Sequence, residues 1–165
     1  MERQALLFVC TGNICRSPMA QAYVLHRAGE DGLALEADSA AVSSEEIGRP
    51  PDGRAVAELS RHGVTMPMHR ARQVTLADFG RFDLVIGMTR SHCASLRALA
   101  PGTHGDKVRL LLDAVPGQAG RDVPDPWYGP DNAFAEVYAL IAAGVDAVVD
   151  ALSPRKGPFA SLIAR

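Results

Sequence analysis

The sequence predicts a single α/β domain of three layers, in which helices cover both faces of a central parallel sheet of about four strands. Short apolar runs, typical of buried strands, alternate with longer segments of helical periodicity, as they do in βαβ units. The chain has 165 residues, of which 47% are hydrophobic and 22% charged, as in an ordinary globular domain. We therefore expect one domain over residues 1–165, with its core at about 5–152 and a frayed tail at 153–165.

The first half of the chain contains two expected strands and two expected helices. Ala5–Cys10 is a continuous apolar run, as a strand buried on both faces should be. Ser17-Pro18 then opens a helix that runs to about residue 28, because serine caps helices and proline fits their first turn. A second strand is expected at 33–39. The next helix starts at Asp52 and ends at Gly63.

The second half of the chain repeats the pattern. Asp83–Met88 fits another buried strand, and the helix expected at 90–100 is stopped by Pro101. A fourth strand is expected at 108–112, and a long helix with one apolar side from Asn132 onward. Strands joined by helices of this length form right-handed parallel crossovers, and such sheets bind ligands beyond the carboxyl ends of the strands. The loop after the first strand is therefore where a site is expected.

Composition and charge exclude several kinds of partner. The formal net charge is −2 and the 17 basic residues are spread along the chain, which gives no support to nucleic-acid binding. Three cysteines are too few for a disulfide scaffold of this size and fit a reducing compartment. The first apolar run is too short for a signal peptide, and no later run approaches the ~20 residues of a membrane span. We expect a cytoplasmic monomer that does not insert into membranes.

The loop after the first strand has the composition of a phosphate cradle. It reads Cys10-Thr11-Gly12-Asn13-Ile14-Cys15-Arg16-Ser17. Backbone N–H groups of a tight loop that runs into a helix converge on one point and favour an anion there. Arg16 adds a forked donor for two phosphate oxygens, and the same positive field favours the nucleophilic thiolate form of Cys10. The alternative, an inert cysteine buried at a strand end, is the weaker interpretation of this spacing.

The segment CTGNICRSP resembles the active-site loop of the low-molecular-weight protein tyrosine phosphatases. The resemblance covers roughly residues 5–150 and includes the blocks DSAAVS, EIG, RHG, HRARQ, FDL and DVPDPWYG. It implies that the chain hydrolyses phosphotyrosine on proteins in two steps, through a phosphocysteine. A phosphotyrosine-containing protein is then the expected partner, and neither a metal nor a cofactor is required.

The resemblance also implies a role for each residue of the site. Cys10 matches the nucleophile and Asp125 the general acid, while the loop from Thr11 to Arg16 would hold the phosphate oxygens. Ser17 would donate to the sulfur as it leaves. The positions whose hydrogen bonds hold the loop in this family are matched by Asn13, Ser17, Ser39 and His69. The remaining histidines, which are given no role, are His26, His62, His92 and His104.

The walls of the expected pocket depart from the family pattern on one side. Trp127 and Tyr128 would form one wall, with an aromatic surface for a phenyl ring. Glu45 stands on the facing wall, where many relatives carry tryptophan or tyrosine. Thr89, which follows Met88, likewise stands where relatives often carry an aspartate. Both departures concern substrate preference rather than the chemistry.

Three other functions compete with this interpretation. An arsenate reductase shares the fold and loop but needs more cysteines for its relay, and only Cys93 lies outside the loop. A protein arginine phosphatase tends to have threonine in place of Ile14. A phosphate-binding or redox-sensing module would leave Asp125 without a use. Redox control is itself expected, because peroxide would oxidise Cys10 to a sulfenic acid that Cys15 could capture as a disulfide.

Overall fold

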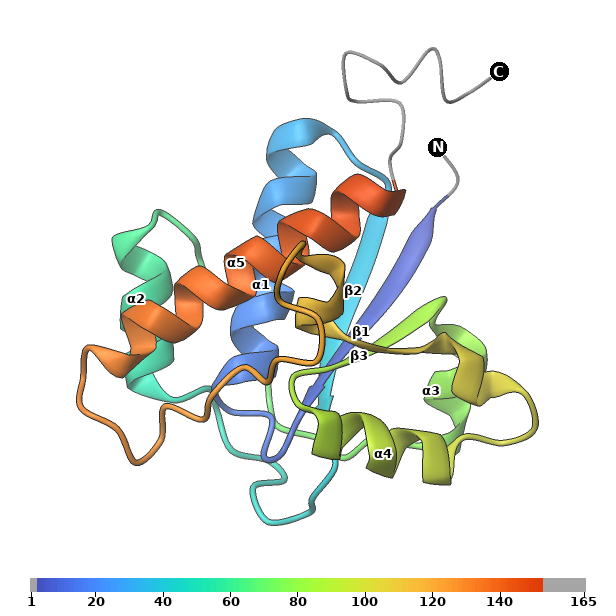
Figure 1. Cartoon of the computed structure of the whole chain (residues 1–165). Helices are drawn as coiled ribbons and strands as arrows, with labels where there is room; N and C mark the ends of the chain where they lie inside the picture. Colours follow the sequence, from blue (N-terminus) through green and yellow to red (C-terminus); the bar gives the residue numbers. More distant parts are fainter. Residues whose placement is uncertain (1–2, 153–165) are drawn as a thin grey trace.

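A four-stranded parallel sheet lies between two layers of helices in the computed structural model, which describes residues 3–152 (Figure 1). The strands, in the order β2-β1-β3-β4, are β1 (Gln4–Cys10), β2 (Leu35–Ala41), β3 (Leu84–Gly87) and β4 (Val108–Leu110). The helices are α1 (Arg16–Asp31), α2 (Gly53–Arg61), α3 (Leu76–Arg81), α4 (Arg90–Leu99) and α5 (Ala133–Leu152), with short 3-10 turns at η1 (His104–Lys107) and η2 (Leu111–Ala114). The expected three-layer α/β architecture is confirmed. The tail expected at 153–165 lies outside the described residues.

Alternate side chains of β1 enter two hydrophobic cores, one on each face of the sheet. Leu6 and Phe8 pack with residues of α1, α2 and α5, whereas Leu7 and Val9 pack with residues of α3 and α4. All four side chains are fully buried, which is why this strand appears in the sequence as an uninterrupted apolar run. Each such side chain stabilises the fold by about 1.5–3 kcal/mol, so β1 is anchored from both sides.

The first helix does not use Ser17 as its cap. α1 begins at Arg16, and Cys15 occupies the N-cap position without a side-chain hydrogen bond to the helix. The Ser17 hydroxyl instead lies 3.0 Å from Cys10 Sγ and accepts a hydrogen bond from the side-chain amide of Asn13. The expectation of a serine cap is wrong because this hydroxyl is used inside the loop.

The second strand starts two residues later than expected. α1 continues to Asp31 and ends at Gly32, whose φ of 65° is the left-handed conformation that glycine adopts without strain. The chain must complete this turn before it can pair, so β2 runs from Leu35, opposite Gln4, rather than over 33–39.

The sequence analysis does not predict α3, because six residues are too few to show helical periodicity. Its start is nevertheless encoded: Thr75 and Asp78 form a reciprocal capping box, in which the Thr75 amide donates to Asp78 Oδ2 over 2.8 Å. Phe79 buries this short helix against the sheet. At the other edge, β4 ends at Leu110 rather than 112, because the chain tightens there into η2.

The long helix α5 crosses the face of the sheet that carries α1 (Figure 1). Gly144 permits its close approach to η2, since a Cβ at this position would lie 2.5 Å from Leu111 Cγ. Over residues 3–152, none of the helices has the length and apolar character needed to cross a membrane.

The carboxyl ends of β1 and β2 lie side by side, with Cys10 paired to Ala41. The backbone pairing continues beyond the strands, because the amides of Val42 and Ser43 donate to the carbonyls of Cys10 and Thr11 over 3.0 and 3.1 Å. The loop after β1 therefore leaves the sheet at its carboxyl edge, where the sequence predicts a site.

Candidate active site

The loop from Cys10 to Ser17 closes around the sulfur of Cys10. Asn13 has a φ of 60°, the left-handed conformation, which asparagine tolerates better than most side chains. This turn aims the Asn13 amide at Cys10 Sγ, 3.3 Å away, while the Ser17 hydroxyl approaches the same sulfur from the first turn of α1. The Cys10 sulfur therefore has two polar partners within the loop, a backbone amide and a hydroxyl.

The side chain of Asn13 ties the loop to neighbouring elements through a buried hydrogen-bond network. Its Nδ2 donates to the hydroxyls of Ser17 and Ser39, each 2.9 Å away. Its Oδ1 accepts from His69 Nε2 over 2.9 Å and from the Arg72 amide over 3.1 Å. The structure thus brings together the residues expected to hold the loop, with Ser39 on β2 and His69 on the segment after α2.

Burial and a further hydrogen bond complete this network. Burial lowers the pKa of His69, so the neutral imidazole is favoured. The hydroxyl of Ser39 donates to Gln21 Oε1 over 2.6 Å, which adds α1 to the network. Gln21 has no role in the sequence analysis, because a polar residue on a helix gives no sign that it faces a serine 18 residues away.

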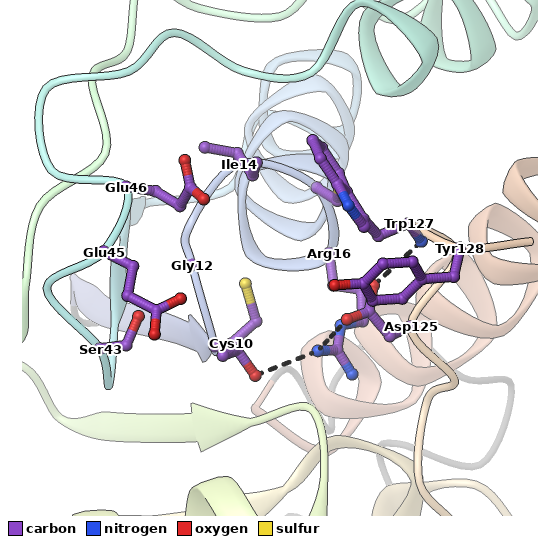
Figure 2. Close-up of a pocket in the computed structure, with 12 residues that line it drawn as sticks. Cys10, Gly12, Ile14, Arg16, Ser43, Glu45, Glu46, Asp125, Trp127 and Tyr128 are labelled. Atoms are coloured by element: carbon purple, nitrogen blue, oxygen red, sulfur yellow. Dashed lines mark hydrogen bonds and ion pairs between the residues drawn. The ribbon is translucent and has the colours of Figure 1, made fainter.

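Arg16 lies buried at the side of the pocket, between the loop and the segment that carries Asp125 (Figure 2). Its Nη1 donates to the Val123 carbonyl over 2.9 Å, and its Nη2 donates to Thr11 Oγ1 over 3.4 Å. Asp125 Oδ2 lies 3.6 Å from the same Nη2, while Asp125 Oδ1 accepts from the Trp127 amide over 3.0 Å. The expected arginine and carboxylate therefore face each other beside Cys10.

A cavity of about 130 Å³ opens above Cys10. It is lined by Cys10, Thr11, Gly12, Ile14, Cys15, Arg16, Ser43, Glu45, Glu46, Asp125, Trp127 and Tyr128. In Figure 2, Trp127 and Tyr128 stand on one side of the Cys10 sulfur, and Glu45 and Glu46 stand on the other. Both expected walls are thus present, one aromatic and one acidic.

The acidic wall contains two residues that the sequence analysis omits, Ser43 and Glu46. Glu46 packs over the loop so closely that a Cβ on Gly12 would lie 3.1 Å from Glu46 Cγ. Arg49 Nε lies 3.1 Å from Glu46 Oε2, an ion pair whose geometry is not that of a hydrogen bond. The sequence signal that could have found them was their position, because Ser43 and Glu46 lie two residues and one residue from Glu45 in the chain.

The aromatic wall is anchored to α2 by Arg54. Its guanidinium lies 5.2 Å from the Trp127 ring centroid and 4.7 Å from that of Phe134, and Nη1 donates to the Trp127 carbonyl over 3.2 Å. Asp52 accepts from Arg54 Nε over 3.1 Å and orients it. Arg54 thus steadies the segment that carries Asp125. Its partner is 73 residues away, so no local pattern reveals this role.

His92, which the sequence analysis gives no role, lies against the loop. Its Nε2 is 2.9 Å from Thr11 Oγ1, and its Nδ1 accepts from the Thr89 amide over 3.1 Å. Burial, aided by the nearby charge of Arg16, lowers its pKa to about 4. Thr89 caps α4 by accepting from the His92 amide, which gives the threonine at this position a structural purpose. His92 is therefore a buried residue at the start of α4 that contacts the cysteine loop.

Cys15 is the thiol nearest to Cys10 in the chain, and it is buried within the same loop. Burial first, and then the charges of Asp52 and Cys10, raise the pKa of Cys15. Cys93 belongs to the core on the opposite face of the sheet, where it donates to the Arg109 carbonyl. Among residues 3–152, no cluster of three or more histidine, cysteine, aspartate or glutamate side chains is placed to hold a metal ion.

The chain is similar to known proteins along most of its length. The model of the family described as "Low molecular weight phosphotyrosine protein phosphatase" matches residues 5–156. A low molecular weight protein-tyrosine-phosphatase of Streptomyces coelicolor is 45% identical over 142 residues, which cover 82% of this chain and 85% of that protein. The crystal structure of YfkJ from Bacillus subtilis has a TM-score of 0.86 at 37% identity and covers 95% of this chain and 99% of its own. Vibrio vulnificus Wzb, solved in complex with benzylphosphonate, has a TM-score of 0.79 at 28% identity and covers 91% of this chain and 99% of its own. The family model matches most of the chain, and the chain also carries the cysteine loop and the facing carboxylate. It therefore belongs to the low-molecular-weight phosphotyrosine protein phosphatase family.

Proposed function

We propose that this protein hydrolyses phosphotyrosine on proteins, through a phosphocysteine formed on Cys10. The observation that carries the proposal is the convergence of three groups on one small pocket. They are a cysteine sulfur contacted by a loop amide and a hydroxyl, a buried arginine, and a carboxylate that faces this arginine. These are the nucleophile, the anion cradle and the proton donor that phosphoryl transfer to a cysteine requires.

In the first step, the Cys10 thiolate attacks phosphorus and forms the S–P bond while the bond to the phenol oxygen breaks. The electron pair of the broken bond goes to the phenol oxygen, which takes a proton from Asp125. Arg16 and the loop amides hold the three equatorial oxygens, where the charge of the transition state resides. Arg16 is already buried and oriented, so little reorganisation is needed.

In the second step, a water molecule attacks the phosphorus of the phosphocysteine. Asp125, now a carboxylate, accepts a proton from this water as the S–P bond breaks. The electron pair returns to sulfur, and the Ser17 hydroxyl at 3.0 Å stabilises the thiolate by donating to it. The products are inorganic phosphate and the starting form of the enzyme, with Asp125 protonated again.

The pocket favours an aromatic phosphate ester. Trp127 and Tyr128 line the pocket on one side of the Cys10 sulfur and offer aromatic surface to a phenyl ring, and Ile14 contributes an apolar edge (Figure 2). The related Wzb was solved in complex with benzylphosphonate, whose phenyl ring lies one carbon from phosphorus. That complex supports the placement of a phenyl ring in the pocket of this protein. Ile14 cannot hydrogen-bond a guanidinium or a water beside it, which counts against phosphoarginine.

The proposal is tested by comparing peptides of one sequence that carry phosphotyrosine, phosphoserine or phosphoarginine, together with arsenate and a thiol reductant. We expect phosphotyrosine to have the highest kcat/KM by at least about tenfold, equivalent to one favourable aromatic contact of roughly 1.4 kcal/mol. A higher value for phosphoarginine would make the protein an arginine phosphatase. Arsenate reduction is not expected, because Cys93 lies across the sheet from Cys10.

We also propose that Cys15 protects Cys10 from irreversible oxidation. Peroxide would convert the Cys10 thiolate to a sulfenic acid, and attack by Cys15 on that sulfur would form a disulfide and release water. Because burial raises the pKa of Cys15, this capture should accelerate as the pH rises from 6 to 8.

The measurement is recovery of activity by a thiol reductant after peroxide treatment, in wild type and in Cys15→Ser. Wild type should recover, and the variant should not. Equal recovery in both, without a Cys10–Cys15 linkage in mass spectra, would remove Cys15 from this role.

A further inference from the structure

We propose that His92 is a positioning residue for catalysis. It holds the hydroxyl of Thr11 beside Arg16, and so keeps the guanidinium in the orientation that binds the phosphoryl group in the transition state. The contact is long-range, because His92 lies 81 residues from Thr11 and reaches the loop from the first turn of α4. This inference rests on the proposed function for the role of Arg16.

The hydrogen bonds of His92 determine which ring nitrogen carries the proton. The Thr89 amide donates to Nδ1 over 3.1 Å, so Nδ1 has no hydrogen. A neutral imidazole then carries its proton on Nε2, which donates to Thr11 Oγ1 at 2.9 Å. The hydroxyl oxygen of Thr11 is thereby fixed by a donor that is itself fixed by the start of α4.

Thr11 is the movable member of the set that orients Arg16. Val123 contributes a backbone carbonyl to Nη1, whereas Nη2 has two side-chain partners, Thr11 Oγ1 at 3.4 Å and Asp125 Oδ2 at 3.6 Å. In the proposed mechanism Asp125 must turn to the leaving oxygen. Thr11 then remains as the side-chain partner of Nη2, and because this residue is exposed, its hydroxyl could otherwise rotate towards water.

Two residues that precede His92 in the chain, Gly87 and Thr89, allow its side chain to reach the cysteine loop. A Cβ at Gly87, where β3 ends, would lie 3.2 Å from His92 Cβ and 2.8 Å from Cys93 Sγ. Glycine at this position therefore permits the first turn of α4 to approach the carboxyl edge of the sheet. Thr89 then fixes where the helix starts.

The electrostatic surroundings keep the imidazole neutral. Burial and the cation of Arg16 lower the pKa of His92 to about 4, against the opposing influence of Asp122 and Asp125. At neutral pH the ring therefore donates to Thr11 without placing a second positive charge beside Arg16, which would repel the guanidinium from that side.

The competing explanation is that His92 only caps α4, and two substitutions separate the roles. The side chain in His92→Asn ends where Nδ1 stands, so it can still accept from the Thr89 amide but does not reach Thr11. The side chain in His92→Gln extends its amide to the position of Nε2 and can donate to Thr11. Thr11→Val removes the hydroxyl at nearly constant shape, and Thr11→Ser retains it.

With a phosphotyrosine peptide, we expect His92→Asn and Thr11→Val each to lower kcat by about threefold to tenfold, the value of one net hydrogen bond. KM should stay within about twofold, because the lost interaction matters most in the transition state. His92→Gln and Thr11→Ser should recover most of the rate. The double variant should lose no more than either single variant, since both remove the same contact. His62→Asn, a histidine paired with Glu58 away from the pocket, is the matched control and should not change kcat.

A second readout is independent of the substrate. Orthovanadate mimics the five-coordinate transition state, so His92→Asn should weaken its calorimetric affinity by the same factor as kcat, while affinity for inorganic phosphate changes by less than about twofold. Unchanged kcat and vanadate affinity in a folded His92→Asn variant, which retains the contact with the Thr89 amide, would make His92 a cap alone and overturn the inference. If wild type binds vanadate but releases no phosphate from phosphotyrosine, the proposed function is wrong. The difference in vanadate affinity between wild type and His92→Asn would still test the role of His92.

Discussion

The two sides of the pocket differ in how strongly the protein constrains them. Six of the eight residues of the cysteine loop, all except Thr11 and Gly12, are buried, and the loop is held by β2, by the segment after α2 and by the first turn of α4. The rim is exposed: Tyr128 has 91% of its surface accessible, Trp127 has 36%, and Glu45 also faces solvent. The loop is therefore suited to fixed chemistry, and the rim to contacts that vary with the substrate.

This difference predicts two classes of variant. Substitutions in the loop should reduce the rate for every phosphate ester, because they remove groups that act on phosphorus or on the oxygens around it. Substitutions on the rim should have small effects that depend on the peptide, because exposed side chains interact through water and are screened by salt. A rim variant that lowered all rates equally would break the distinction.

The largest effect is expected for Cys10→Ser. A serine hydroxyl is not ionised at neutral pH and cannot replace the thiolate, so turnover should fall below about 1% of wild type while the fold remains intact. Steady-state assays with an aryl phosphate, together with circular dichroism, measure both properties. Activity above that level in a folded variant would mean that another group attacks phosphorus.

Asp125→Asn should show a loss that depends on the leaving group. Proton donation is worth about 10²–10⁴-fold when the departing phenol is weakly acidic, and much less when it is acidic enough to leave as a phenolate. A series of aryl phosphates therefore measures the role of Asp125 directly. Equal losses along the series would remove Asp125 from proton transfer and leave it as a partner of Arg16.

The buried side of the pocket should also respond to acid. The pKa of His92, about 4 in the folded protein, lies below its ordinary value of about 6.5, so the unfolded chain takes up this proton first as the pH falls. Stability from this group is present above about pH 6.5 and is lost between there and pH 4. Asp122 and Asp125, which raise the pKa, limit the loss, and Arg16 adds to it.

Between pH 7 and pH 5 we expect wild type to lose on the order of 1–2 kcal/mol of unfolding free energy through His92. His92→Gln should lose less over the same interval, as measured by urea denaturation at each pH. The remaining loss of unfolding free energy includes a contribution from His69, because burial also lowers the pKa of this residue. Parallel curves for wild type and His92→Gln would contradict the assignment of a neutral, buried imidazole.

The smallest effect is expected on the rim, for Glu45→Gln. A carboxylate at the pocket entrance should favour peptides with basic residues beside phosphotyrosine over acidic ones, by about 0.5–1 kcal/mol at low salt. The variant should lose this preference while its kcat for a small aryl phosphate is unchanged. A preference that survives the substitution would transfer the selectivity to Glu46 or to another residue.

Residues that are contiguous in the chain were the easiest to predict. The loop from Cys10 to Ser17 could be recognised in the sequence because one short segment holds the cysteine, the arginine and the helix start. The strands β1 and β3 are equally legible because they are buried on both faces and hence apolar throughout. Asp125 required the resemblance to a known family, since an Asp-Pro pair alone indicates only a turn.

Contacts between residues far apart in the chain were predicted only where the family resemblance supplied them, as for Asn13, Ser39 and His69. His92 and Arg54 act on residues 81 and 73 positions away, and nothing near them in the sequence marks either side chain. The capping box that starts α3 was legible in principle, but the helix is too short for its periodicity to be seen. Ser17 shows the converse, because a residue typical of a helix cap is used by the neighbouring sulfur instead.

The most direct test of the account is to look for the covalent intermediate. Wild type and Asp125→Ala should be mixed with an aryl phosphate that has an acidic phenol, quenched within the first turnover, digested and analysed by mass spectrometry. In Asp125→Ala the second step lacks its proton acceptor, so the phosphoryl group should accumulate on the peptide that contains Cys10, and more of it than in wild type. An unmodified Cys10 in both proteins, during turnover that releases phosphate, would contradict the central claim that this sulfur carries the phosphoryl group.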